Sequence, residues 1–345
     1  MRPTFIAVRA SLSLVAALLA ASCSQTDSPS GPETAAPETT APDSSATLDT
    51  VATADSGGTA DLSYSGIAFG PYGLYATVTE FEPNAAPFTG SIENSFANSI
   101  VKRIAAARQQ KHRIVLAMTG GSNEYITSGK FDLGKWKARM NTFNTATIKK
   151  AVADAVADGT VVGNKLIDEP ETPKWGGVLT KPMLDGMASY VKNMFPTLPV
   201  GVAYGTRGYQ WRTNEVYRVV DWTLSQYMWI VTKGNVTAWR DAVLSRARAD
   251  GVTPVFSLNL LDGGYKDTVG AWDCPNTGGV GTFNRYCRMT ADQVRSWGQA
   301  LGPYGCVMLA WRYDDTFMAK SANQSAFRDV SSMLNAKPRR SCKRP

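Results

Sequence analysis

The side chains best suited to acid–base chemistry stand together where a short apolar segment ends. Lys165–Ile167 reads as a buried strand and runs directly into Asp168 and Glu169. Two neighbouring carboxyls in a partly closed site repel each other, which raises the pKa of the one that keeps its proton. Pro170 disfavours the helical region for Glu169, so we expect the chain to leave the strand extended with a carboxylate projecting from its end. A polar turn without chemistry is the alternative.

Other kinds of site lack the residues they need. His112 is the only histidine, and its polar surroundings predict a surface position. A Ser-His-Asp triad and a zinc site with several histidines are therefore improbable. Neither the glycine-rich phosphate loop nor the dinucleotide-binding glycine pattern occurs. We expect no metal and no cofactor, which leaves carboxylates, with tyrosine and lysine behind them, for acid–base work.

Strand and helix signals alternate along residues 63–345, the usual length of one (β/α)8 barrel. Seven strands are expected: Ser65–Phe69, Arg113–Met118, 161–171, Leu198–Tyr204, Asp221–Met228, Pro254–Leu261 and Cys306–Trp311. The expected helices are Asn94–Gln110, Leu133–Asp158 with a break near Asn144, Lys181–Met194, Val236–Asp250, Ala291–Leu301 and Gln324–Leu334. An eighth strand lies within residues 76–91, or the barrel is irregular there. An open doubly wound sheet is the alternative fold.

Barrel enzymes keep their reactive groups at the carboxyl ends of the strands. Counting back from the last strand, Asp168 and Glu169 end the fourth. Polar and aromatic residues in or beside the other strand ends are the expected substrate contacts: Trp175, Tyr204, Gln226, Tyr227, Asn259, Trp311, Arg312 and Asp314.

In this arrangement the chain resembles the (β/α)8 glycoside hydrolases of clan A. Their fourth strand ends in Asn-Glu-Pro, where Glu is the general acid/base, and Asp168-Glu169-Pro170 differs only at the first position. The resemblance also implies a tyrosine after strand six and a tryptophan after strand eight, where Tyr227 and Trp311 fall. The clan's nucleophile is a Glu ending strand seven, which is missing here. Asp262 is the substitute, with a turn-forming role before two glycines as its equal alternative.

The adjacent Asp-Glu pair is also similar to that of substrate-assisted hexosaminidases, such as families 20 and 123. That resemblance implies that Asp168 orients the acetamido group of the sugar while Glu169 protonates the leaving oxygen. No carboxylate on strand seven is needed in this mechanism, so both readings stay open.

The N-terminal residues indicate export and a tether. A basic start and an apolar run predict a signal peptide over residues 1–22, and Leu18-Leu-Ala-Ala-Ser-Cys23 resembles the bacterial lipobox. We expect lipid on Cys23, with cleavage as an ordinary secreted protein the alternative. Residues 23–62 are rich in Ser, Thr, Ala, Pro and Asp and predict a disordered tether. The expected location is the bacterial cell envelope, anchored to the membrane or secreted.

Net charge differs between the tether and the domain. The chain as a whole has a formal charge of +7, but its tether has acids and no Lys or Arg. The domain is therefore more basic than the whole chain, which favours contact with anionic glycans, lipid headgroups or other polyanions. No nucleic-acid-binding motif accompanies this charge.

Four cysteines remain after Cys23, and an exported chain permits disulfides. Of three possible pairings we favour Cys274–Cys287 with Cys306–Cys342. The second bond would fix the basic tail to the barrel.

These features predict a glycoside hydrolase-like enzyme that acts on a cell-envelope or extracellular polysaccharide or oligosaccharide. Glu169 is the expected general acid/base, and Asp168 orients substrate or stabilises charge. A glycan-binding surface lipoprotein without catalysis is the alternative, because strand seven lacks its Glu. A lyase with Tyr227 or Lys165 as base is a third.

Overall fold

The computed structural model describes residues 64–120, 122–206, 215–232, 234–264 and 287–345. Contacts divide the chain into two units, Met1–Gly57 and Gly58–Pro345, and every described residue belongs to the second. The signal peptide, Cys23 and the tether lie outside the described residues and stay predictions. Within the described residues, no helix has the length and apolar character that crossing a bilayer requires.

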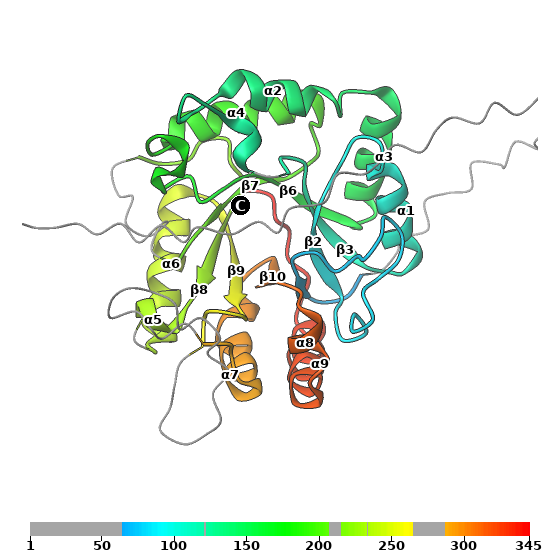
Figure 1. Ribbon diagram of the computed structural model, residues 1–345, viewed down its shortest axis with the longest axis vertical. Coiled ribbons are helices and arrows are strands. Elements are labelled where there is room, and N and C mark those ends of the chain that lie inside the picture. The colour runs from blue at the N-terminus through cyan, green and yellow to red at the C-terminus, as the bar shows by residue number, and fades with distance from the viewer. Residues whose placement is uncertain (1–63, 121, 207–214, 233, 265–286) are drawn as a thin grey trace, which may run out of the picture. The chain divides into compact units, whose positions relative to one another are not determined.

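Eight parallel strands form one sheet that curves into a nearly closed ring (Figure 1). The strands are β1 Ala68–Pro71, β2 Gly90–Asn94, β3 Arg113–Ala117, β6 Val161–Asp168, β7 Val200–Tyr204, β8 Trp222–Tyr227, β9 Thr253–Asn259 and β10 Val307–Trp311. Their order is β1-β10-β9-β8-β7-β6-β3-β2, and neighbouring strands in this order pair in parallel. The predicted (β/α)8 barrel is thus confirmed, and β6 is its fourth strand.

The ring closes where β1 meets β2. A parallel bridge joins Tyr72 to Ile92, and the Gly73 N–H donates to the Ile92 carbonyl at 3.0 Å. A Cβ on Gly70 would lie 1.5 Å from the Gly90 carbonyl oxygen, so only glycine allows this approach. The expected eighth strand therefore exists, but it begins at the very end of residues 76–91. Gly-Ser-Ile-Glu-Asn has a single large apolar residue, which explains why its pattern is weak.

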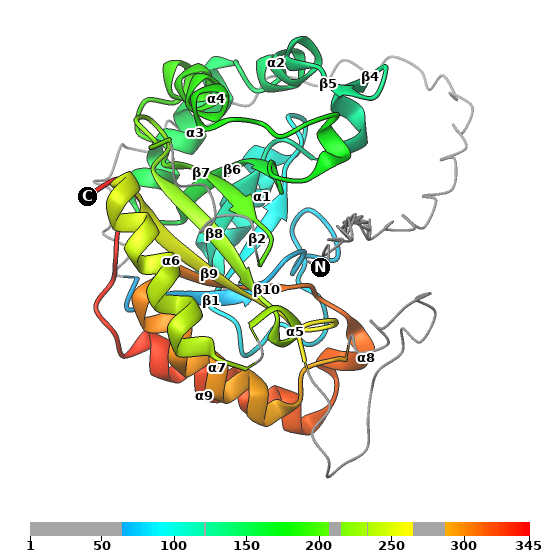
Figure 2. The same ribbon diagram turned by 90° about the vertical axis from the view of Figure 1, so that its left-hand side faces the viewer.

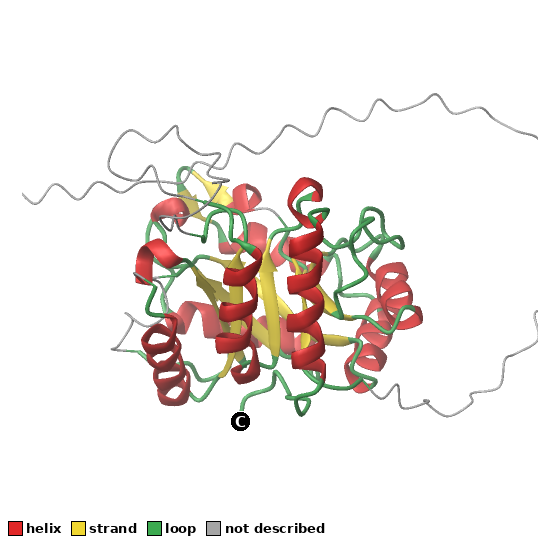
Figure 3. Ribbon diagram, turned by 90° about the horizontal axis from the view of Figure 1, so that it is seen from below, coloured by secondary structure: helices red, strands yellow, loops and turns green. Residues whose placement is uncertain are grey.

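Helices cover the outside of the ring (Figures 2 and 3). They are α1 Ile100–Gln109, α2 Leu133–Asn141, α3 Ala146–Ala157, α4 Lys181–Met194, α5 Trp229–Thr232, α6 Val236–Asp250, α7 Ala291–Leu301, α8 Asp315–Met318 and α9 Ser321–Asn335. Short 3-10 turns occur at η1 Ser122–Tyr125, η2 Pro173–Trp175 and η3 Gly302–Tyr304, and a small hairpin joins β4 Ile126–Thr127 to β5 Lys130–Phe131. The predicted break near Asn144 is confirmed, because Thr145 caps a new helix by accepting from the Ile148 N–H.

Two apolar layers sandwich the strands, as the alternation of side chains requires. The outer layer joins strands to helices, and the inner layer fills the ring. The inner layer is built from alternate residues, among them Ala68, Ile92, Val115, Ala203, Leu224, Val255 and Leu309. The indole of Trp222 occupies the space beside Gly201, where an added Cβ would lie 1.9 Å from its ring. The ring interior is therefore packed rather than open.

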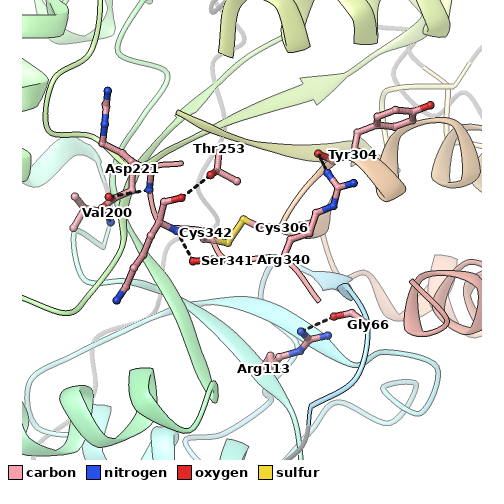
Figure 4. The surroundings of a disulfide bond; sticks show 12 residues. Gly66, Arg113, Val200, Asp221, Thr253, Tyr304, Cys306, Arg340, Ser341 and Cys342 are labelled. Carbon is pink, nitrogen blue, oxygen red and sulfur yellow. Dashed lines mark hydrogen bonds between the residues drawn. A yellow bond between two sulfur atoms is a disulfide. The ribbon is translucent and has the colours of Figure 1, made fainter. Parts of the chain in front are cut away.

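The C-terminal tail closes the end of the ring where the strands begin (Figure 4). Cys342 is disulfide-bonded to Cys306, just before β10, with the two Cα atoms 5.3 Å apart, so this predicted pairing is confirmed. Arg344 donates to the carbonyls of Val220 and Tyr217 at 2.8 and 3.2 Å. A bond closing a loop of this size typically stabilises a protein by about 2–4 kcal/mol. Cys274 lies outside the described residues, so its pairing with Cys287 stays a prediction.

His112 is buried, which corrects the expected surface position. Only 2% of it is exposed, and its ring packs edge-on against Tyr75 and Phe81, at 5.9 and 4.9 Å between centroids. These aromatics come from the loop between β1 and β2, far from the polar residues that flank His112 in sequence. Burial lowers the pKa of the imidazole to about 3.

This histidine should weaken the fold in acid. Its pKa is about 6.5 when unfolded and about 3 when folded, so the unfolded chain binds the extra proton between these values. The free energy of unfolding should fall by about 1.4 kcal/mol per pH unit in that window relative to a His112→Phe variant. Glu93 and Glu171, with pKa values raised to about 7, act in the opposite direction but are present in both proteins. Urea unfolding of the unaltered protein and of His112→Phe from pH 7 to 4 measures this difference in pH dependence. The same change of unfolding free energy with pH in both proteins would contradict the prediction.

Candidate active site

The carboxyl ends of the strands gather the predicted reactive residues at one opening of the barrel, here called the mouth. Asp168 ends β6, Asn259 ends β9 and Trp311 ends β10, while Tyr72 follows β1. Because all eight strands are parallel, these ends meet at the same side of the ring. Successive side chains of a strand point to opposite faces, so the residue two positions after an inner-layer residue also faces inward. At the strand ends these inward residues face the mouth: Tyr72, Asn94, Gly205, Gln226, Asn259 and Trp311.

Glu169 turns sharply away from β6. Its φ is +45°, a left-handed conformation, which corrects the expectation that the chain leaves the strand extended. Proline disfavours only the right-handed helical region for the residue before it. The Glu169 N–H donates to the Ala203 carbonyl at 2.8 Å, and its own carbonyl accepts from Thr172 and from the indole of Trp175. The local hydrogen bonds offset the strain of this turn.

Two lysines hold the acid pair. Lys174 Nζ lies 3.1 Å from Glu169 Oε2 and 3.7 Å from Asp168 Oδ2. Lys165 Nζ lies 3.7 Å from Asp168 Oδ1, and its side chain is only 10% exposed. The side chains of Asp168 and Glu169 are each 41% exposed, so solvent and a ligand can reach them. The turn at Glu169 thus directs both carboxylates towards the same ammonium group.

Tyr72 and Trp311 form an aromatic wall next to these charges. Their rings meet edge-on with centroids 5.0 Å apart, and Lys165 Nζ is 5.4 Å from the Tyr72 ring. Both residues are partly exposed. Burial and the charges of Asp168 and Glu169 raise the pKa of the Tyr72 phenol well above its usual value. The phenol therefore stays neutral and can donate a hydrogen bond beside the acid pair.

Glu171 is a third carboxyl at this turn. Its Oε1 accepts from the Gly205 N–H at 2.9 Å, while its Oε2 is buried without a hydrogen-bond partner. Burial, and to a lesser extent the charges of Glu169 and Asp168, raise the pKa of Glu171 to about 7. A carboxyl with such a pKa gains or loses its proton around neutral pH.

Strand seven ends in an amide instead of a carboxylate. Asn259 donates to Gln226 Oε1 at 3.2 Å and accepts from the Asp262 N–H at 3.0 Å through its own side-chain oxygen. The Gly263 N–H donates to the Asn259 carbonyl at 2.7 Å, so Asp262 sits in a tight turn. This geometry brings Gln226 and Asn259 together in the mouth. The backbone of Asp262 thus takes part in the turn that the alternative predicted, and its role as nucleophile stays a prediction.

Three expected contact residues lie behind the mouth rather than in it. Tyr227 is fully buried between β8 and the helices, with its ring 4.8 Å from Trp297 and 5.3 Å from Trp239. Tyr204 is 1% exposed, and its hydroxyl contacts that of Tyr217. Trp175 is 2% exposed and donates to the carbonyls of Asp168 and Glu169. Because these three side chains are buried, they support the strand ends and do not contact a sugar directly.

The last loop contributes one exposed cation. Arg312 is exposed, with its guanidinium carbon 5.9 Å from the Trp311 ring. Asp314 instead caps α8 by accepting from the Phe317 N–H at 2.8 Å, and it lies 3.9 Å from Arg288. In the part of the chain that the structure describes, no three acidic, histidine or cysteine side chains are placed to share a metal ion.

Sequence reasoning passed over Tyr72, Lys174 and Glu171. Glu171 had a visible signal, because residues 168–171 contain three acids around one proline. Tyr72 also had one, since alternation from Ala68 places it on the inner face of β1. Lys174 had none, because its reach depends on the left-handed turn at Glu169.

No protein-family profile matches this chain, and neither does any curated protein. Among solved structures, the chain is similar to endo-glycoceramidase II from Rhodococcus sp., at 12% identity and TM-score 0.44, over 74% of each chain. It is similar to a GH18 chitinase from Pseudoalteromonas aurantia, at 11% identity and TM-score 0.43, over 77% of this chain and 100% of that one. A GH113 beta-1,4-mannanase gives 9% identity and TM-score 0.46, over 79% and 99%. Sequence identities and TM-scores this low carry none of the chemistry of these proteins over to this chain.

Proposed function

We propose that this protein is a glycoside hydrolase-like enzyme acting on a cell-envelope or extracellular polysaccharide or oligosaccharide. The observation that supports it most is the joint placement of Asp168, Glu169 and Glu171 at the mouth, beside the aromatic wall of Tyr72 and Trp311. Glycoside hydrolysis uses a proton-donating carboxyl and an ionised one on either side of the scissile bond. Aromatic faces next to them can stack on sugar rings.

In this proposal Glu169 is the general acid/base, since it is exposed and has Lys174 at 3.1 Å to stabilise its ionised form. Asp168 orients the substrate or stabilises developing charge. Strand seven ends in Asn259, so the proposal favours assistance by the substrate itself over attack by Asp262. Lys165, Lys174 and Arg312 at or beside the mouth favour a substrate with anionic groups.

The test is a product assay with the purified domain. Neutral and acidic polysaccharides, including acetamido sugars, are incubated with the protein and the products analysed by mass spectrometry. Gain of one water per cleaved bond supports hydrolysis. A product with a new double bond would instead indicate a lyase, in which Lys165 is the remaining candidate base, because Tyr227 is buried.

A glycan-binding lipoprotein without catalysis is the second candidate, and the amide at the end of β9 favours it. Saturable binding with no product over long incubation would select it. In both cases we propose export and lipid attachment at Cys23, for which the lipobox resemblance is the basis. Mass spectrometry of the mature N-terminal peptide tests this: an unmodified Cys23, or a different first residue, would contradict it.

A further inference from the structure

The C-terminal tail, residues 336–345, forms a basic surface at the end of the ring opposite the mouth, here called the floor of the barrel. The tail has no acidic side chain, and its cations are Lys337, Arg339, Arg340, Lys343 and Arg344. All of them are exposed except Arg344, which is half-buried. The Cys306–Cys342 disulfide holds the tail on the barrel, as does a hydrogen bond of 3.3 Å from Arg340 to a backbone carbonyl of η3 (Figure 4). These charges therefore belong to a fixed surface.

Three acids at this end of the barrel do not offset the charge of the tail, because each already has a cation as partner. The pairs are Asp158 with Arg108 at 2.6 Å, Asp221 with Lys192 at 2.8 Å and Asp250 with Lys181 at 2.7 Å. Two further cations, Lys111 just after α1 and Arg248 near the end of α6, are exposed. Because the helices end where the strands begin, both add to the positive charge of the floor.

The N-terminal end of the described chain reaches the same floor. Arg113, at the start of β3, donates to the carbonyls of Gly66 and Ser65 at 2.9 and 3.1 Å (Figure 4). About forty residues separate Tyr64 from Cys23, the proposed site of lipid attachment. A flexible chain of this length has an average end-to-end distance of about 35 Å. A lipid at Cys23 would thus tether the domain by its basic end and keep that end close to a membrane.

We propose that the floor of the barrel binds the surface of a membrane that contains anionic phospholipids. Basic side chains near such a surface each strengthen binding about fivefold, and the guanidinium groups of Arg339 and Arg340 suit bidentate pairing with phosphate. The choice of lipid over another polyanion rests on the proposed anchor, which would hold the floor at high local concentration near the headgroups. The binding does not depend on the chemistry at the mouth. With the floor on the membrane, the mouth faces away from the bilayer, towards glycans outside it.

The test is sedimentation of the full chain with vesicles. All proteins have Cys23→Ser, so that no lipid is attached and the N-terminal residues are identical. Vesicles of equal parts phosphatidylglycerol and phosphatidylcholine should bind the protein, and about 1 M salt should release it, because the Debye length falls to about 3 Å. The floor variant replaces four exposed cations by Gln, which should weaken binding at least about 100-fold. The four are Lys337, Arg339, Arg340 and Lys343.

The matched control removes the same charge from the other end of the barrel. It replaces four exposed lysines near the N-terminal ends of α1, α2 and α3 and in the hairpin of β4 and β5. They are Lys102, Lys130, Lys135 and Lys149. The control should keep most of the binding. An equal loss in the control and the floor variant would show that only net charge matters, and equal binding to vesicles of phosphatidylcholine alone would show that anionic headgroups do not; either result would overturn the proposal.

Two further measurements keep the test decisive. Arg344 stays unchanged in the floor variant, so the tail retains its contacts with the Val220 and Tyr217 carbonyls, and circular dichroism checks the fold. If the floor variant does not fold, the smaller change of Lys337→Gln with Lys343→Gln should still weaken binding about tenfold or more. Stronger binding to alginate than to vesicles, compared per anionic charge, would assign the floor to an acidic polysaccharide and overturn the lipid proposal. Because the assay uses no attached lipid, failure of the floor and failure of the anchor at Cys23 are distinguishable.

Discussion

Replacing Glu169 by Gln should lower kcat/KM for glycan hydrolysis by about 100- to 10,000-fold, the usual contribution of a general acid–base group. The amide keeps the size of the side chain but can neither donate a proton at neutral pH nor pair with Lys174. Because this side chain is 41% exposed, the change should cost little stability. Product release assayed by mass spectrometry, with thermal unfolding followed by circular dichroism, measures both effects.

The matched control is Asp154→Asn, an exposed carboxylate paired with Lys150 on helix α3. It should leave hydrolysis unchanged. Glycan affinity measured by calorimetry should change far less than the rate in Glu169→Gln, because the aromatic wall is retained. Hydrolysis at the rate of the unaltered protein would remove Glu169 from the chemistry and leave binding as the function.

Alternation decides which strand-end residues reach the mouth, and it was available from sequence alone. Gln226 follows Trp222 and Leu224 on the inner face, so its neighbour Tyr227 has to face the helices. The same reasoning places Gly205, rather than Tyr204, at the mouth. The fold itself was predictable because strands and helices alternate with strong periodicity. The position of β2 was predicted only loosely, because Ile92 is its one large apolar residue.

Long-range contacts set the rest of the site, and local patterns do not specify them. His112 stands among polar neighbours, yet Tyr75 and Phe81 from a distant loop bury it. Lys174 meets Glu169 only because the chain turns left-handed there. The raised pKa of Glu171 depends on its burial at this turn. Pro170 led to the expectation of an extended exit from β6, whereas the turn is left-handed. Sequence thus indicated the acid pair but not the buried third carboxyl of Glu171 beside it.

Lys181 supports the mouth from behind, through a buried ion pair. The residue begins α4 and is fully buried, with its Nζ 2.7 Å from Asp250 Oδ2 and 2.8 Å from the Glu215 carbonyl oxygen. Its ammonium is also 5.0 Å from the ring of Tyr217, whose hydroxyl contacts Tyr204 at the end of β7. Next along the chain comes Gly205, which holds Glu171. The pair therefore connects α4 and α6 to the strand end that shapes the acid site.

Lys181→Met should lower the free energy of unfolding by about 3 kcal/mol, near the lower end for breaking a buried ion pair, because Arg246 still contacts Asp250. Urea unfolding measures this loss, and Lys149→Met, exposed on α3, should stay within about 0.5 kcal/mol of the unaltered protein. Adding Asp250→Asn to Lys181→Met should recover part of the loss, since the buried charge is then removed. If the loss in the double variant equals the sum of the losses in Lys181→Met and Asp250→Asn, the two side chains act independently. A loss in Lys181→Met that is relieved in the double variant would show that the cost arises because the Asp250 carboxylate keeps only one of its two cations.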